Sequence, residues 1–181
     1  VDGINARALE AAKVRTAVDR RAIAARNIMF TTQASDIATI KAEALRADED
    51  VQRSLSALKK MVNDSSDVSE EARQLVAKIE QIESRYRPVA LKIVDMASQG
   101  DYESATLSIN NECRPVLAAL ISATNEYQDQ TEKRAAEMLA AADAAFVQQR
   151  NGLIASGLLA LLAAIAAGVL ITRDLLRALG A

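Results

Sequence analysis

Residues 152–171 read GLIASGLLALLAAIAAGVLI and contain no charged side chain. The hydrocarbon core of a bilayer is about 30 Å thick, and a helix of about 20 apolar residues is long enough to cross it. The residues before this run are rich in polar and charged side chains, and Thr172 and Arg173 follow it at once. The pattern predicts a transmembrane helix over 151–172 that ties a polar domain, residues 1–150, to a membrane by its C-terminal end.

The charges at the two ends of this helix predict its orientation, because Lys and Arg close to a membrane helix favour the cytoplasmic side. Arg173 and Arg177 lie just beyond the apolar run, whereas Arg150 precedes it. This modest asymmetry favours a domain outside the cytoplasm. The sequence begins at Val1 without Met, so we expect an upstream segment, either a first membrane helix or a cleaved signal peptide.

The composition predicts an all-α protein. The 181 residues include only six Gly and two Pro, and strong helix formers such as Ala and Leu are abundant. Alternating runs of β-branched and aromatic residues, which indicate strands, are missing. The chain has no His, which excludes His-based catalytic triads and His metal ligands, and its single Cys excludes an internal disulfide. We expect Cys113 to be a small core residue.

The sequence offers little support for nucleic-acid binding or for catalysis. The net charge of −2 gives no argument for binding nucleic acid. No nucleophile, acid and base occur in a pattern that predicts a catalytic site, so we predict that the protein is not an enzyme and needs no cofactor or metal.

Three polar segments interrupt the helical pattern, at 31–36, 63–67 and 98–101. The helices predicted between them cover residues 4–32, 36–62, 67–98 and 102–150, and the last should run on into the membrane helix. Asp67 with Glu70 three positions later is typical of a capping box at a helix start. Gly100 suits the position after a helix end, and Asp101 suits the next N-cap.

Apolar residues recur at helical intervals along the second and third helices. In the third helix they alternate between steps of three and four: Val68, Ala72, Leu75, Ile79, Ile82, Tyr86, Val89, Ile93 and Met96. In the second helix the series is Ile37, Ile40, Ala44, Asp48, Val51, Leu55, Leu58 and Val62, with Asp48 as its only interruption. Such seams predict packed helices, and short connections predict an antiparallel up-down-up-down four-helix bundle.

Both prolines, Pro88 and Pro115, fall inside predicted helices. Proline removes a helical hydrogen bond and bends the helix. Two interpretations are open, because the bends either create space beside the helices or only fit the curvature of the bundle.

Counting from the predicted turns places several arginines at one height. At about 1.5 Å per residue, four of them lie roughly 20 Å from the end of the bundle far from the membrane: Arg20, Arg21, Arg87 and Arg114. Arg26 lies closer to that end, and Asp48 shares the lower level and should pair with one arginine. The other guanidinium groups either extend into solvent or bind an anion.

For the layer as a whole we favour a binding site for a small organic anion, with Tyr86 and Thr124 as neutral donors. The candidate ligand-binding residues are Arg20, Arg21, Arg26, Tyr86, Arg87, Arg114 and Thr124.

The segments VDRRAIAARNIMF at 18–30, RPV at 87–89 and 114–116, and ITRDLLRALG at 171–180 carry a resemblance. With them the chain resembles the periplasmic four-helix-bundle sensor domain, plus the second transmembrane helix, of bacterial methyl-accepting chemotaxis proteins. The resemblance implies a homodimeric chemoreceptor in the bacterial inner membrane. It also implies a HAMP-like linker that begins at residues 173–181, and a cytoplasmic kinase and adaptor as partners through a C-terminal part that is not in this sequence.

The resemblance also bears on the ligand. In the aspartate-sensing members, three arginines of the first helix bind the ligand across a dimer interface. Arg15 and Arg20 keep the spacing of the first two, but the third position holds Ala24, and Arg26 follows two residues later. The first helix is also similar to that of relatives that sense organic acids, which favours a di- or tricarboxylate. The alternatives are the sensor of a membrane histidine kinase and a structural membrane-anchored bundle without a ligand.

Overall fold

The computed structural model describes the backbone of residues 2–179 and the side chains of 3–165, 167–169 and 172–173. Most of the predicted linker at 173–181 lies outside the described side chains. The chain divides into two compact units, Val1–Ala135 and Ala136–Ala181, and each is described by itself.

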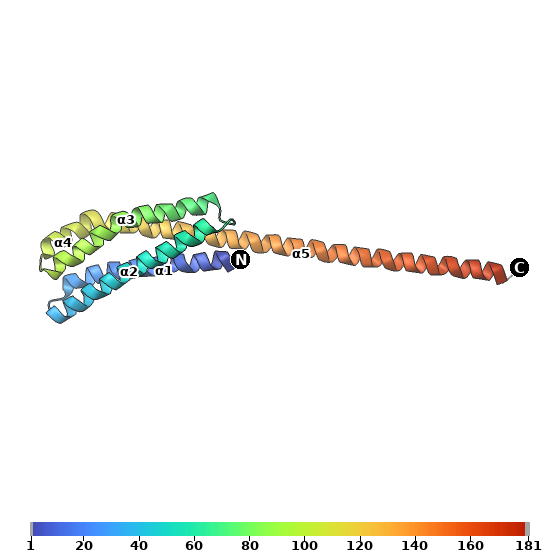
Figure 1. Cartoon of the computed structure of the whole chain (residues 1–181), viewed down its shortest axis with the longest axis horizontal. Coiled ribbons are helices and arrows are strands. Elements are labelled where there is room, and N and C mark those ends of the chain that lie inside the picture. Colours follow the sequence, from blue (N-terminus) through green and yellow to red (C-terminus); the bar gives the residue numbers. More distant parts are fainter. Residues whose placement is uncertain (1, 180–181) are drawn as a thin grey trace. The chain divides into compact units, whose positions relative to one another are not determined.

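The first unit is a bundle of antiparallel helices (Figure 1). Its elements in order are α1 (Asp2–Asn27), the 3₁₀ turn η1 (Ile28–Phe30), α2 (Ala34–Asp64), α3 (Glu70–Ser98), α4 (Tyr102–Ser108), the π-helical turn η2 (Ile109–Cys113) and α5 (Arg114–Leu179), which continues into the second unit. The all-α prediction and the four-helix bundle are confirmed. The predicted fourth helix is present, but the π turn divides it into α4 and α5.

The core confirms the predicted seams. In α2 the residues Ala44, Asp48, Val51, Leu55, Leu58 and Val62 are buried. In α3 the predicted residues Ala72, Ile79, Tyr86 and Ile93 are buried, and the others of the series are partly buried against them. Burial of these apolar faces against one another is the main source of stability in such a bundle.

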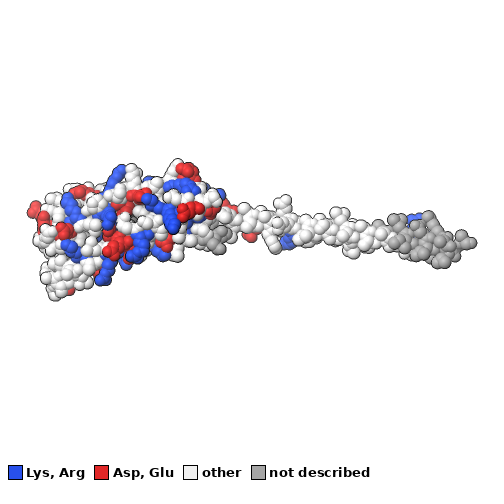
Figure 2. All heavy atoms as spheres, in the orientation of Figure 1, with Lys and Arg blue, Asp and Glu red and all other residues white. Residues whose placement is uncertain are grey.

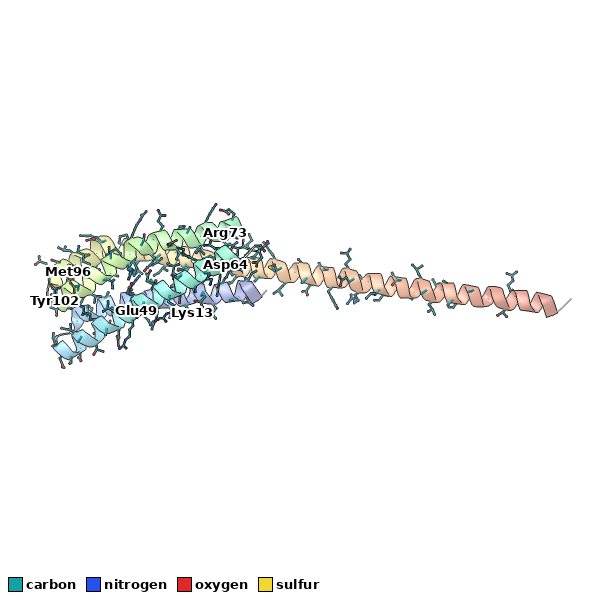
Figure 3. The ribbon with its side chains drawn as sticks, in the orientation of Figure 1. Lys13, Glu49, Asp64, Arg73, Met96 and Tyr102 are labelled. Carbon is teal, nitrogen blue, oxygen red and sulfur yellow. The ribbon has the colours of Figure 1, made fainter. Side chains whose placement is uncertain are left out.

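The start of α3 differs from the prediction. Ser69, not Asp67, is the N-cap, because its hydroxyl accepts a hydrogen bond from the Ala72 N–H at 3.2 Å. Asp67 instead accepts hydrogen bonds from both terminal nitrogens of Arg7, at 3.3 and 2.9 Å. The helix therefore begins at Glu70, and Asp67 joins the α2–α3 connection to α1. Figure 3 shows Asp64 and Arg73 on either side of this connection.

The pair of Arg7 and Asp67 predicts how the stability of the fold depends on pH. The hydrogen bond from Arg7 lowers the pKa of Asp67 below its ordinary value. A carboxyl whose pKa is depressed on folding stabilises the fold above its unfolded pKa, about 3.9, and loses this contribution as the pH falls through the folded value. We expect Asp67→Asn to lower the melting temperature at neutral pH and to lower it less at a pH well below the unfolded pKa of about 3.9.

The matched control for this effect is Asp129→Asn, because the Asp129 side chain is exposed and has no hydrogen-bond or ion-pair partner in the described part of the chain. Thermal unfolding followed by circular dichroism over this pH range measures both variants. A loss for Asp67→Asn that is equal at both pH values would contradict the pairing.

The α3–α4 turn was predicted correctly. Gly100 has φ = 84°, in the left-handed region, and follows the end of α3. The Asp101 carboxylate accepts a hydrogen bond from the Ser104 N–H at 3.1 Å and caps α4.

Replacing Gly100 with alanine should cost about 1 kcal/mol of stability. A Cβ atom at this position would have no heavy atom within 4 Å, so the cost comes from the backbone conformation and not from a clash. Gly152→Ala is the control, because it has the same open space without a left-handed φ. Chemical denaturation of both variants measures the difference, and equal stability of the two would contradict this explanation.

The second unit is the part of α5 from Ala136 onwards. Apart from the partly buried Met138, its described apolar side chains are exposed, among them Phe146, Leu153 and Ile154. Within the helical stretch Tyr102–Val169, one window is long and apolar enough to cross a membrane by length and composition. In Figure 2, Lys, Arg, Asp and Glu cover the first unit but are sparse over this helix.

Candidate functional site

Arg21 lies at the centre of a buried ionic cluster that joins three helices. Its Nη1 donates to Asp48 Oδ1 of α2 at 2.6 Å and to Glu83 Oε1 of α3 at 2.9 Å, and its Nη2 donates to Glu83 Oε2 at 2.6 Å. Asp48 also accepts two hydrogen bonds of 3.1 Å from Arg87 Nε, so it pairs with two arginines and not with one. Gln52 Nε2 donates to Glu83 Oε1 at 3.0 Å.

The charges of this cluster balance inside the protein. The side chain of Arg21 has an exposed fraction of 0%, and those of Asp48 and Glu83 have 6% and 3%. Burial lowers the pKa of Arg21, but the hydrogen bonds and charges of Glu83 and Asp48 outweigh it, so the pKa lies above its ordinary value. Arg21 is therefore always charged, and its two carboxylates compensate it without a ligand.

The other predicted arginines line three different grooves of the bundle. Arg20 pairs with Asp50 and lines a groove between α1 and α2. Arg87 is half exposed and lines a cleft between α2 and α3, where Lys59 pairs with Glu80. In both places the charged groups are largely paired with one another.

Arg26 and Arg114 come together at a third groove, between α1 and the η2–α5 segment. Its volume is about 520 Å³, and its apolar lining includes Ile23, Ile109 and Leu117. Asp19, Asn110 and Cys113 complete the polar part of the lining, together with the two arginines. Both arginines are exposed, and neither forms a hydrogen bond or ion pair within the described part of the chain. We call this the α1–η2 groove.

The π turn that lines this groove has a cause in the sequence. Pro115 has no N–H and cannot donate to the carbonyl of Asn111, four residues earlier. Just before it the helix widens, and the Arg114 N–H donates to the carbonyl of Ile109, five residues earlier. Such π turns occur frequently at functional sites. Of the two interpretations of the prolines, space beside the helix applies here, since Asn110, Cys113 and Arg114 all line the groove.

The predicted neutral donors, Tyr86 and Thr124, do not line the α1–η2 groove. Tyr86 is fully buried, and the Arg21 guanidinium lies over its ring at 4.8 Å from the centroid. The Thr124 hydroxyl donates to the carbonyls of Leu120 and Ile121 at 3.1 and 2.9 Å, so it is bonded within its own helix. Cys113 is 7% exposed, as expected of a core residue, and burial raises the pKa of its thiol.

The most important residue that sequence reasoning missed is Glu83. It lies four residues after Ile79 and three before Tyr86, on the buried face of α3. A carboxylate on that face, at the height of the predicted arginines, could have indicated a buried ion pair with one of them. No comparable signal in the sequence marks Ile109 and Asn110, because they line the groove only as a result of the π turn.

A family model described as a four-helix-bundle sensory module for signal transduction matches residues 8–146. The chain therefore belongs to this family, which is the type of sensor domain found in methyl-accepting chemotaxis proteins. No curated protein matches it. The family assignment makes the chain a signal-transduction sensor module and confirms the resemblance seen in the sequence.

Proposed function

We propose that this protein is a membrane chemoreceptor that binds a small organic anion, a di- or tricarboxylate, in the α1–η2 groove. One observation carries the proposal. Arg26 and Arg114 come from helices far apart in the sequence, line one groove, and have no acidic partner in the described part of the chain.

The chemistry of the groove fits such a ligand. Each guanidinium presents a planar set of donors that can bind a carboxylate through two hydrogen bonds. Two such groups suit an anion with two carboxylates, and Ile23, Ile109 and Leu117 offer apolar surface for its carbon chain. Asp19 also lines the groove, but it accepts a hydrogen bond from Arg15 at 3.2 Å, which compensates its charge.

The groove favours a sensor over a ligand-free structural bundle. A structural bundle predicts exposed arginines on all faces and no concave site, whereas here Arg21 is buried and Arg26 and Arg114 line a groove. The sensor of a membrane histidine kinase remains the alternative, since it has the same kind of bundle and differs in the cytoplasmic part.

The proposed receptor signals because its ligand binds two conformations of the protein with different affinities. A ligand biases a conformational equilibrium only by the difference in its affinity for the two states. Arg26 belongs to α1, and Arg114 is the first residue of α5, the helix that also contains the apolar span. A ligand held by both residues therefore favours one arrangement of α5 against α1, and in this family type a cytoplasmic kinase and its adaptor would respond.

For localisation we propose the bacterial inner membrane, with the bundle in the periplasm. The apolar window in α5 and the exposed apolar side chains of the second unit support this. Protease treatment of spheroplasts tests it. Digestion of the bundle in intact spheroplasts is the expected result, and protection until the membrane is permeabilised would contradict it.

We also propose a homodimer that forms through α1. Leu9, Ile23 and Phe30 are 58%, 48% and 82% exposed, and they are spaced by fourteen and seven residues, which are multiples of a heptad, along α1 and η1. Sedimentation of the full chain in detergent should give the mass of a dimer, and a monomer at all concentrations would contradict this.

The test of the proposed ligand class is thermal unfolding of the full chain in detergent with a panel of organic acids. A ligand at about 100 times its Kd stabilises the folded state by about 2.7 kcal/mol, which raises the melting temperature measurably. We expect succinate or citrate to do so and butyrate, with a single carboxylate, to do so less. An equal response to all acids, or none to any, would contradict a site for di- or tricarboxylates.

A further inference from the structure

The α1 wall of the α1–η2 groove has a cation at one end and a carboxylate at the other. Arg26 and Asp19 both line the groove and are separated by about two turns of the helix, so they lie on the same face of α1. At about 1.5 Å per residue, roughly 10 Å of helix lies between them. The lining in this interval is apolar, with Ala22, Ile23 and Ala25. The wall therefore changes from positive through apolar to negative along the groove.

A contact nearer the start of α1 gives the level of the facing wall. Arg15 Nη1 of α1 donates to Asn125 Oδ1 of α5, and the two helices run antiparallel (Figure 1). The same number of residues leads from Arg15 to Arg26 along α1 as from Asn125 back to Arg114 along α5. The two groove arginines therefore lie at the same level, at the end of the groove away from Asp19.

A small dicarboxylate between these arginines leaves most of the groove empty. Succinate has eight non-hydrogen atoms, and at about 30 Å³ for each, the share of a water molecule in the liquid, it takes less than half of the groove volume of about 520 Å³. The part left over lies toward Asp19, where Ala22 of α1 and Leu117 of α5 offer apolar surface. A further apolar part of the ligand fits there.

Asp19 determines what the far end of such a ligand presents. Its Oδ2 accepts a hydrogen bond from Arg15 Nε at 3.2 Å, and this arginine compensates the charge of the carboxylate. Oδ1 takes no part in that bond, and an ionised carboxylate accepts several hydrogen bonds. An uncharged hydroxyl group can donate to Oδ1 without disturbing the balance of charge, whereas a carboxylate at this end would be repelled. The roughly 10 Å between Asp19 and Arg26 keep the carboxylates of the ligand away from Asp19.

We propose that the ligand of the α1–η2 groove is a dicarboxylate with a short apolar tail that ends in a hydroxyl group. Arg26 and Arg114 hold the two carboxylates. The tail packs on Ala22 and Leu117, and the hydroxyl group donates to Asp19 Oδ1, so Asp19 determines the specificity for the end of the tail. This inference rests on the proposed function and makes its ligand class narrower.

Calorimetric titration of the full chain in detergent with three probes tests the tail and its end group separately. The probes are succinate, 2-butylsuccinate and 2-(4-hydroxybutyl)succinate. We expect butylsuccinate to bind about tenfold more tightly than succinate, which is less than the full burial of four CH₂ groups would give and suits a groove open to solvent. The hydroxybutyl acid should bind about fivefold more tightly again, as one partly exposed hydrogen bond provides.

Asp19→Ala removes the acceptor and should bind the butyl and hydroxybutyl acids equally. The loss of a negative charge beside the groove changes all affinities together, so the ratio between these two probes is the readout. Asp19→Asn keeps a side-chain oxygen and should keep part of the preference. Asn125→Ala is the matched control, because it removes the other hydrogen bond of Arg15 at a position that does not line the groove. Its ratio should equal that of the parent.

Ala22→Leu tests the apolar part of the groove, because the larger side chain fills the space that the tail needs. It should cancel the tenfold advantage of butylsuccinate and leave succinate binding unchanged. Ala12→Leu is the control, because Ala12 is also partly buried on α1 but lines the groove between α1 and α2. This variant should bind all three probes as the parent does.

The outcomes distinguish the tail from the proposed function. Equal binding of the butyl and hydroxybutyl acids, or a preference that survives in Asp19→Ala, overturns the role of Asp19. An advantage of butylsuccinate that is missing in the parent, or that survives in Ala22→Leu, overturns the apolar tail. In each of these cases binding of succinate leaves the proposed function intact, whereas failure of all three probes to bind overturns both proposals.

Discussion

Replacing Arg21 with methionine will lower the free energy of unfolding by about 3–5 kcal/mol. The side chain is fully buried and binds Asp48 and Glu83, so its loss leaves two carboxylates in the core with less compensation. Denaturant unfolding of the full chain in detergent, followed by circular dichroism, measures the change.

Two further variants make this prediction specific. Arg20→Met alters the neighbouring residue, whose pair with Asp50 is exposed, and should cost much less than Arg21→Met. The triple variant Arg21→Met, Asp48→Leu, Glu83→Met removes the three buried charges and leaves only Arg87, which is half exposed. It should regain most of the lost stability, because buried ion pairs can be replaced by apolar residues at little cost. If Arg21→Met were as stable as Arg20→Met, the cluster would not have the role assigned to it.

Removing either groove arginine will weaken binding of a dicarboxylate by about ten- to a hundredfold. A hydrogen bond to a charged group contributes about 1.5–3 kcal/mol, and each factor of ten in Kd corresponds to about 1.4 kcal/mol. We therefore expect Arg26→Gln and Arg114→Gln each to raise the Kd for succinate in calorimetric titrations, with little change in stability because both side chains are exposed.

Arg46→Gln and Arg85→Gln are the matched controls. Both arginines are exposed and lie on helices of the same bundle, but neither lines the groove. Their Kd values should equal that of the parent. A uniform loss of affinity in all four variants would indicate attraction by overall positive charge and not a site.

The sequence was sufficient to predict the helices and their packing. Apolar spacing in α2 and α3 identified the buried faces, and Gly100 with Asp101 located a turn and a cap. The start of α3 was placed wrongly because Asp67 and Ser69 are both good N-caps. The long-range pair of Asp67 with Arg7 decides between them, and a local pattern cannot show it.

The sequence analysis assigned the arginines a height along the bundle but not the face to which each side chain extends. Counting residues along helices gave Arg20, Arg21, Arg87 and Arg114 a common level, but the rotation of each helix sends them to different faces. Arg21 enters the core to meet Glu83, whereas Arg114 reaches the groove. The π turn before Pro115 also changes the rotation of every residue that follows it, and a regular helical count cannot include such a turn.

We propose that an organic anion binds between Arg26 and Arg114. A nuclear magnetic resonance titration of succinate that follows the arginine Nε–H signals of the full chain in detergent observes these two groups directly. We expect saturable shifts of the Arg26 and Arg114 signals with one common Kd, while those of Arg46 and Arg85 stay in place. Shifts of equal size at all four arginines, or no shift at Arg26 and Arg114, would contradict it.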